Sequence, residues 1–109
     1  MKRLYLLITS IFLFYGFTQA ESYQYNKAYY ILNEEYRTAQ IIGFQQSVTS
    51  ISIPEKIECD GVTYTVTSIG SSFAKDSRLD YVSIPNSIIS IGANAFRSSW
   101  ITSVTILLL

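Results

Sequence analysis

The sequence contains no histidine and a single cysteine, Cys59. Without histidine, the chain lacks the commonest general base and metal ligand, and a serine nucleophile would lack its usual activator. Cys59 lies between Glu58 and Asp60, whose negative charges disfavour a reactive thiolate. One cysteine also excludes an internal disulfide bond, so packing must stabilise the fold. These absences argue against an enzyme, and we expect no cofactor and no metal ion.

Carboxylate pairs are the remaining candidates for catalysis. Glu34 and Glu35 are adjacent, and Asp76 and Asp80 are close in the sequence. Such a pair could hydrolyse a glycosidic bond if the fold held the carboxylates about 5 to 10 Å apart. Solvated turns and loops are the more ordinary interpretation, but a small secreted hydrolase stays an alternative. No run of alternating Asp or Asn ends in a chelating Glu, so calcium is not expected either.

Basic residues are few after Ala20. Six of them stand against eight acidic residues there, which gives a formal charge of −2. A protein that binds nucleic acid needs a basic stripe to displace counterions from the phosphates. Nucleic acid is therefore not an expected partner.

The segment from Met1 to Ala20 has the pattern of a secretory signal peptide. Lys2 and Arg3 give a positive start, an apolar run follows from Leu4 to Phe17, and Thr18 to Ala20 supply small residues for cleavage. The apolar run is shorter than the roughly 20 residues needed for a membrane-spanning helix. We therefore predict export to the periplasm, the cell surface or the medium, with no membrane span after cleavage.

Aliphatic residues after position 46 recur with a spacing of three and then two. Three sets show it: Val48, Ile51 and Ile53; Leu79, Val82 and Ile84; and Ile101, Val104 and Ile106. The third set repeats the second after 22 positions. The last two members of each set alternate with a polar residue, as in a half-buried strand. A period in the twenties indicates a solenoid in which each coil packs on its neighbours.

A second mark recurs with the same period. Ile69-Gly70 returns as Ile91-Gly92 after the same interval, and a phenylalanine, Phe73 or Phe96, follows each pair closely. The first copy carries nine additional residues, including Asp60-Gly61, which is a strong signal for a two-residue hairpin turn. We therefore predict a hairpin insertion at residues 55–66 within the repeats.

Residues 21–46 are predicted to form an N-terminal capping hairpin, because tyrosine and β-branched residues suit pleated strands. Tyr29 to Leu32 and Ala39 to Phe44 would form the strands, with Asn33 to Glu35 as the turn. The alternative is an amphipathic helix over residues 27–42.

The other end of the repeat region, residues 47–109, has no evident cap. The chain ends in Leu107-Leu108-Leu109, and a bare apolar end leaves an unprotected strand edge. This pattern indicates either a truncated fragment of a longer repeat protein with no independent function, or a partner that covers the edge, such as a second copy.

The repeats resemble the BspA-like leucine-rich repeat of secreted and surface proteins of the Bacteroidetes type. The resemblance is carried by residues 66–73, 81–88 and 90–96, while residues 53–70 are similar to the first repeat of such proteins. It covers about Val48 to Ile106. The resemblance implies a right-handed solenoid with strands on one face, export to the cell surface, and adhesion to proteins or cells. The coils here are one residue shorter than the family's usual unit, and only two repeats are clear.

The strands also predict a binding surface. If the aliphatic residues face inward, Tyr81 and Ser83 face outward, and Ser52, Ser83 and Thr105 line up across successive coils as a polar ladder. Tyrosine offers a large rigid contact and a hydroxyl group. Tyr81, Ser83, Ser52 and Thr105 are therefore the candidate binding residues, although the hydroxyls could simply keep the sheet soluble. Trp100 is either an exposed anchor or part of a cap.

The predicted fold class is mainly β: a short right-handed leucine-rich-repeat solenoid of about 22-residue coils with an N-terminal β-hairpin cap. The predicted function is that of a non-enzymatic exported binding or adhesion module, with an extracellular protein or glycan as its ligand.

Overall fold

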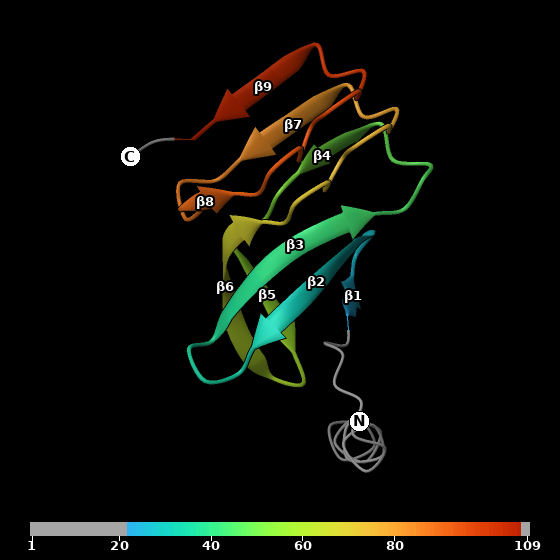
Figure 1. Ribbon diagram of the computed structural model, residues 1–109. Helices are drawn as coiled ribbons and strands as arrows, with labels where there is room; N and C mark the ends of the chain where they lie inside the picture. Colours follow the sequence, from blue (N-terminus) through green and yellow to red (C-terminus); the bar gives the residue numbers. More distant parts are fainter. Residues whose placement is uncertain (1–21, 108–109) are drawn as a thin grey trace, which may run out of the picture.

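The computed structural model describes residues 22–107, which form strands and turns and contain no helix (Figure 1). No segment of this range is therefore a helix able to span a membrane. The predicted signal peptide and the last two leucines lie outside the described residues. The strands are β1 (Tyr23–Tyr25), β2 (Ala28–Asn33), β3 (Thr38–Phe44), β4 (Ser50–Ser52), β5 (Lys56–Cys59), β6 (Val62–Ile69), β7 (Tyr81–Ile84), β8 (Ser90–Ile91) and β9 (Ser103–Ile106).

The strands form two sheets. The large sheet has the order β1-β2-β3-β6-β5, with β8 paired to the end of β6, and the small sheet has the order β4-β7-β9. In Figure 1 the small sheet lies at one end of the molecule and the tyrosine-rich strands at the other.

The N-terminal strands form an antiparallel meander, which confirms the predicted hairpin and extends it by one strand, β1. The β2–β3 turn begins at Asn33, whose Oδ1 accepts hydrogen bonds from the backbone N–H groups of Glu35 and Tyr36 at 3.0 and 3.1 Å. Side-chain acceptors of this kind favour a turn over a helix. The alternative of a helix over residues 27–42 is therefore wrong.

The predicted hairpin insertion is also present. Strands β5 and β6 pair antiparallel, with Cys59 opposite Val62. Asp60 and Gly61 connect them with φ angles of 52° and 78°, and two positive φ angles are typical of the turn that matches the twist of paired strands. The insertion lengthens β6 and widens the large sheet.

Parallel pairing between successive windings of the chain shows that equivalent residues return to equivalent positions. On one side, Ile41 of β3 lies opposite Ile69 of β6, which lies opposite Ile91 of β8. On the other, Ile51 of β4, Val82 of β7 and Val104 of β9 are aligned in the same way.

The chain thus makes three coils, which contain β3 and β4, the end of β6 with β7, and β8 with β9. The predicted solenoid is present, and its first coil uses β3, which the sequence had assigned to the cap.

A column of aromatic rings connects the three coils. Phe44 and Phe73 meet edge to face with ring centroids 5.1 Å apart, and Phe73 and Phe96 do so at 5.9 Å. Such arrangements are favourable because the positive edge of one ring meets the negative face of the next. Each coil therefore contributes one phenylalanine to a continuous contact along the stack.

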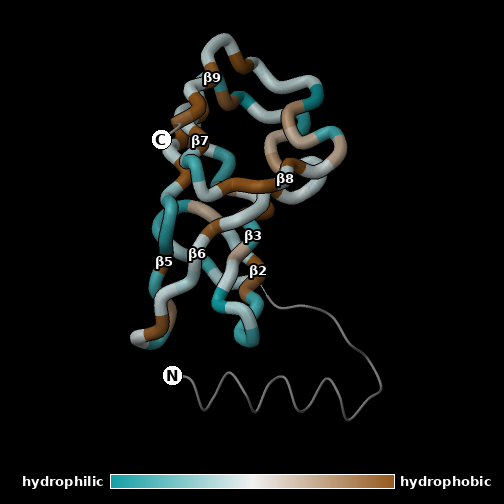
Figure 2. The backbone as a smooth tube through the Cα atoms, turned by 90° about the vertical axis from the view of Figure 1, so that its left-hand side faces the viewer, coloured by the Kyte–Doolittle hydropathy of each residue, from teal (hydrophilic) through white to brown (hydrophobic). Residues whose placement is uncertain are grey.

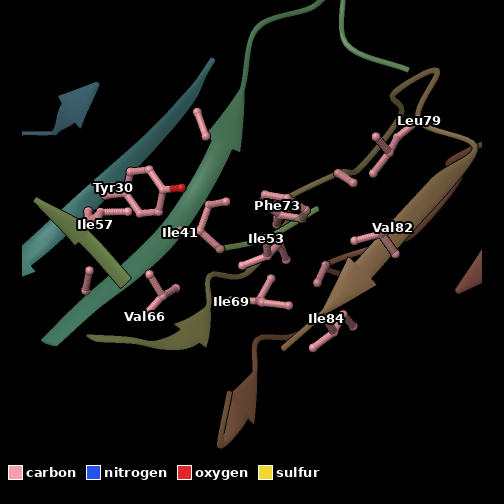
Figure 3. Close-up of a cluster of buried hydrophobic side chains, with 14 of the residues drawn as sticks. Tyr30, Ile41, Ile53, Ile57, Val66, Ile69, Phe73, Leu79, Val82 and Ile84 are labelled. Atoms are coloured by element: carbon pink, nitrogen blue, oxygen red, sulfur yellow. The ribbon is translucent and has the colours of Figure 1, made fainter. Parts of the chain in front are cut away.

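The buried core runs from the meander into the coils (Figure 3). Tyr30, Ile57 and Val66 occupy one end, and Leu79 and Val82 the other. The complete set of buried hydrophobic residues within the described range is Ala28, Tyr30, Ala39, Ile41, Ile53, Ile57, Tyr64, Val66, Ile69, Phe73, Ala74, Leu79, Val82, Ile84 and Ala95.

Burial in the third coil differs from the expectation. Ile69 is 1 % exposed whereas its aligned partner Ile91 is 51 % exposed, and Val82 is fully buried whereas Val104 is 48 % exposed. The alignment holds, but β9 is an outer strand with one neighbour in the described part of the chain. Side chains of the third coil are covered from one side only. Figure 2 shows the resulting hydrophobic stretches at β8 and β9.

Candidate binding surface

The face of the small sheet that is turned away from the core carries rows of hydroxyl side chains. In one row Ser52, Ser83 and Thr105 lie side by side on β4, β7 and β9, as the sequence predicted. The parallel register therefore brings together residues that are far apart in the chain.

A second row on the same face adds residues that the sequence analysis did not name. Ser50 and Ser103 flank Tyr81 on the neighbouring strands. The signal for them was present, because the repeat period that aligns Val82 with Val104 also aligns Tyr81 with Ser103. The face as a whole offers hydroxyl groups around one central phenol and carries no charged side chain in these two rows.

Exposure separates the predicted residues into two groups. Ser52 and Thr105 are exposed and Tyr81 is half-buried, whereas Ser83 lies in the predicted row but is only 8 % exposed. Ser83 has a small side chain on the central strand, with a paired strand on either side. A ligand on this face would therefore meet Ser52, Tyr81 and Thr105 rather than Ser83.

The acidic residues considered for catalysis lie at exposed turns and loops. Glu34 and Glu35 belong to the β2–β3 turn, and Asp76 and Asp80 to the segment between β6 and β7. The backbone of Asp80 has a structural role, because its carbonyl accepts hydrogen bonds from the N–H of Thr102 at 3.0 Å and of Ser103 at 3.2 Å. No group of three or more His, Cys, Asp or Glu that could hold a metal occurs among residues 22–107.

Cys59 lies at the end of β5, next to the first strand of the meander. The Tyr23 hydroxyl donates a hydrogen bond of 3.1 Å to the carbonyl of Glu58. Burial, followed by the proximity of Cys59, raises the pKa of Tyr23 above its usual value. These contacts place Cys59 where the hairpin insertion meets the meander.

Trp100 precedes β9 and is 63 % exposed. The guanidinium carbon of Arg78 lies 5.5 Å from the centre of its ring, within the range of a cation–π contact. Trp100 is thus exposed and held against the preceding coil through Arg78, a partner that the sequence spacing did not identify.

A depression of about 650 Å³ lies beside β4, on the edge that does not pair with β7. Its walls come from the β1–β2 turn and from the segment that leads into and out of β4. We call it the β4 groove; its lining includes Tyr25, Lys27, Ser50, Ser52 and Lys56. Sequence reasoning did not find it because the two walls are separated in the chain by β2 and β3 and belong to different predicted units.

Comparison with known proteins supports the fold. No protein-family model and no curated protein matches the sequence. Solved structures do match. A leucine-rich repeat protein from Bacteroides capillosus superposes with a TM-score of 0.70 at 24% identity, over 78% of this chain. A leucine rich cell surface protein from Faecalibacterium prausnitzii gives 0.71 at 28% identity, over 82% of this chain. The chain has the leucine-rich-repeat fold.

This leucine-rich-repeat chain is also similar to a protein of that class from Bacteroides ovatus, with a TM-score of 0.68 at 22% identity over 75% of its length. It spans 64% of the Bacteroides capillosus protein but only 24% and 22% of the other two. The BspA-like resemblance of the repeats is therefore confirmed at the level of the fold, and the larger neighbours contain much more chain than this one.

Proposed function

We propose that this protein is an exported, non-enzymatic binding module whose small sheet contacts a protein or glycan outside the cytoplasm. The observation that carries the proposal is that one accessible face of a parallel sheet holds Ser52 and Thr105 in one row and Tyr81 in the neighbouring row. Repeated hydroxyls can donate and accept hydrogen bonds, and the tyrosine supplies a rigid contact with little loss of side-chain entropy. The similar Faecalibacterium prausnitzii protein is described as a cell surface protein, which supports an extracellular setting.

Binding to arrayed extracellular proteins and glycans tests the proposal. A ligand found with the native protein should bind Tyr81→Ala and Thr105→Lys at least about tenfold more weakly, because Tyr81 lies at the centre of the face and Thr105→Lys places a bulky charge on it. Thr63→Lys is the matched control, since Thr63 is also an exposed strand threonine but lies in the hairpin insertion. Equal losses in Thr105→Lys and Thr63→Lys would show that the ligand uses another surface.

Export rests on the leader segment from Met1 to Ala20. When the chain is expressed with this leader in a Gram-negative bacterium, N-terminal sequencing of the exported product should begin at Glu21. Ile11→Arg interrupts the apolar run and should keep the protein in the cytoplasm at full length. Export of that variant with the leader intact would contradict the assignment.

We also propose self-association through the third coil. Ile89, Ile91, Val104, Ile106 and Leu107 are all about half exposed or more, and β9 has an open edge within the described range. Exposed apolar edge strands pair with other strands, and antiparallel β9–β9 pairing about a two-fold axis would cover both copies.

Sedimentation at increasing concentration tests this interface. The native protein should form a dimer, and Ile106→Lys should shift it to a monomer because the lysine would be buried in the new sheet. Tyr36→Lys is the control, since Tyr36 is 70 % exposed in the β2–β3 turn. A native protein that stays monomeric at about 100 μM would rule out the interface in the micromolar range.

A further inference from the structure

We infer that the β4 groove is a docking site for an extended peptide segment that carries carboxylate side chains. The inference goes beyond the binding face proposed above, because it uses the backbone edge of β4 rather than the outer side chains of the small sheet. It rests on three observations: an open strand edge, a depression beside it and a single sign of charge among the residues that line it.

The open edge follows from the hydrogen bonds of β4. The carbonyl of Thr49 accepts a bond of 2.8 Å from Asp80, and the N–H of Ile53 donates one of 2.9 Å to Ser83. Backbone groups of odd-numbered residues thus point toward β7. Because successive residues of a strand point to opposite edges, the N–H and C=O groups of Ser50 and Ser52 point away from β7. Both residues line the groove.

The groove provides a space of about 650 Å³ beside this edge. Its wall opposite β4 is the β1–β2 turn with Tyr25 and Ala28, so an incoming chain would lie between β4 and the meander. Peptides that add a strand to a sheet edge gain affinity from main-chain hydrogen bonds, and side-chain neighbours give selectivity. Tyr25 and Val48 are half-buried in the wall and offer apolar contact to alternate residues of such a peptide.

The charged residues that line the groove indicate which side chains a bound peptide would carry. Lys27 and Lys56 line the groove and are exposed, whereas the lining contains no aspartate or glutamate. Neither ammonium group forms an ion pair with a carboxylate of residues 22–107. The groove is therefore cationic on a mature chain whose formal charge is −2. Carboxylate side chains on an added strand would meet a lining whose charged side chains are both lysines.

The experiment uses a fluorescein-labelled octapeptide of alternating valine and glutamate, titrated with the purified protein at low salt. We expect binding that weakens about tenfold in the Lys27→Glu/Lys56→Glu variant, since each exposed pair contributes about 1.5- to 5-fold and reversal adds repulsion. Lys75→Glu is the matched control, because Lys75 is exposed and lies outside the groove. Thermal melts of all three proteins should coincide.

Two further probes distinguish strand addition from simple charge attraction. An octapeptide N-methylated at alternate residues cannot donate to the β4 carbonyls and should lose binding. Ser52→Pro removes a donor on the groove edge without touching the bonds to β7, and should weaken the native peptide several-fold.

Equal binding of the methylated peptide, or unchanged binding by the double lysine variant, would overturn the proposal. So would selective binding of an oligoglucuronate in place of the peptide, which would make the groove a glycan site. Tyr81→Ala should leave peptide binding unchanged, so failure here and failure of the proposed outer face are distinguishable.

Discussion

Truncation of aligned isoleucines in the second and third coils tests the coil stack directly. Ile69 and Ile91 occupy the same register position, but Ile69 is 1 % exposed and Ile91 is 51 % exposed. Replacing a buried isoleucine by alanine costs about 2 to 5 kcal/mol, because transfer energy is lost and a cavity remains. At Ile91 only about half of the side chain leaves water on folding and no closed cavity forms, so we expect about 1 kcal/mol.

Urea unfolding followed by far-ultraviolet circular dichroism measures both effects. A domain of this size is stabilised by about 4 to 13 kcal/mol, so Ile69→Ala could approach the limit of folding. Ile69→Val is the milder companion, for which we expect a loss of about 0.5 to 1.5 kcal/mol, against a few tenths for Ile91→Val. Equal losses at the two positions would refute the idea that each coil covers the one before it.

Three further predictions follow from single contacts. A Cβ at Gly92 would collide with the backbone of the preceding coil, including Gly70, so Gly92→Ala should lower the free energy of unfolding in urea by about 1 to 3 kcal/mol. A Cβ at Gly70 would meet a side-chain methyl group at 3.3 Å, so Gly70→Ala should lower it less. Burial, with a smaller effect of Tyr25, raises the pKa of Tyr30 to about 12. The contribution of the Tyr30 phenol to stability should be complete below pH 10 and should disappear as the pH rises through 12. The midpoint of urea unfolding should fall over this pH range in the native protein, and Tyr30→Phe should not show that fall. Ser87 donates a hydrogen bond of 2.7 Å to a β6 carbonyl, so Ser87→Ala should lower stability by about 0.5 to 1.5 kcal/mol in thermal melts.

Spacing in the sequence was sufficient to predict the coils from residue 47 onward. The aliphatic pattern is periodic because parallel strands place equivalent residues opposite one another, as Val82 and Val104 show. The Asp60-Gly61 turn was equally predictable, since few residues adopt two consecutive positive φ angles. Both signals depend on local backbone chemistry or on a fixed period, and both are visible in a single sequence.

The first coil could not be recognised in the same way. Ile41 precedes Phe44 by three residues, whereas Ile69 precedes Phe73 by four and Ile91 precedes Phe96 by five. The phenylalanine column nevertheless forms, because the connecting turns absorb the difference. Unequal spacing hides the equivalence in the sequence, which left this strand assigned to the cap alone.

The candidate binding face was predictable in register but not in accessibility. Alternation along β7 places Ser83 opposite to its buried neighbours, but alternation carries no information on how closely flanking strands cover a small side chain. The β4 groove was not predictable, because its walls meet through the packing of the meander against the first coil. Surfaces formed between separate segments require the tertiary structure.

The hairpin insertion supplies a large share of the buried core. From residue 86 to residue 107, Ala95 is the only buried hydrophobic residue, so the third coil adds little interior. The insertion, in contrast, contributes Ile57, Tyr64 and Val66 to the buried cluster that contains Tyr30 of the meander. Figure 3 shows Ile57 and Val66 at the same end of this cluster as Tyr30. A single coil cannot offset its own ordering entropy, and this enlarged end adds buried apolar surface beyond that of the coils themselves. The residues that interrupt the period in the sequence therefore act as part of the cap, and truncations within them should destabilise the protein more than equivalent truncations in the third coil.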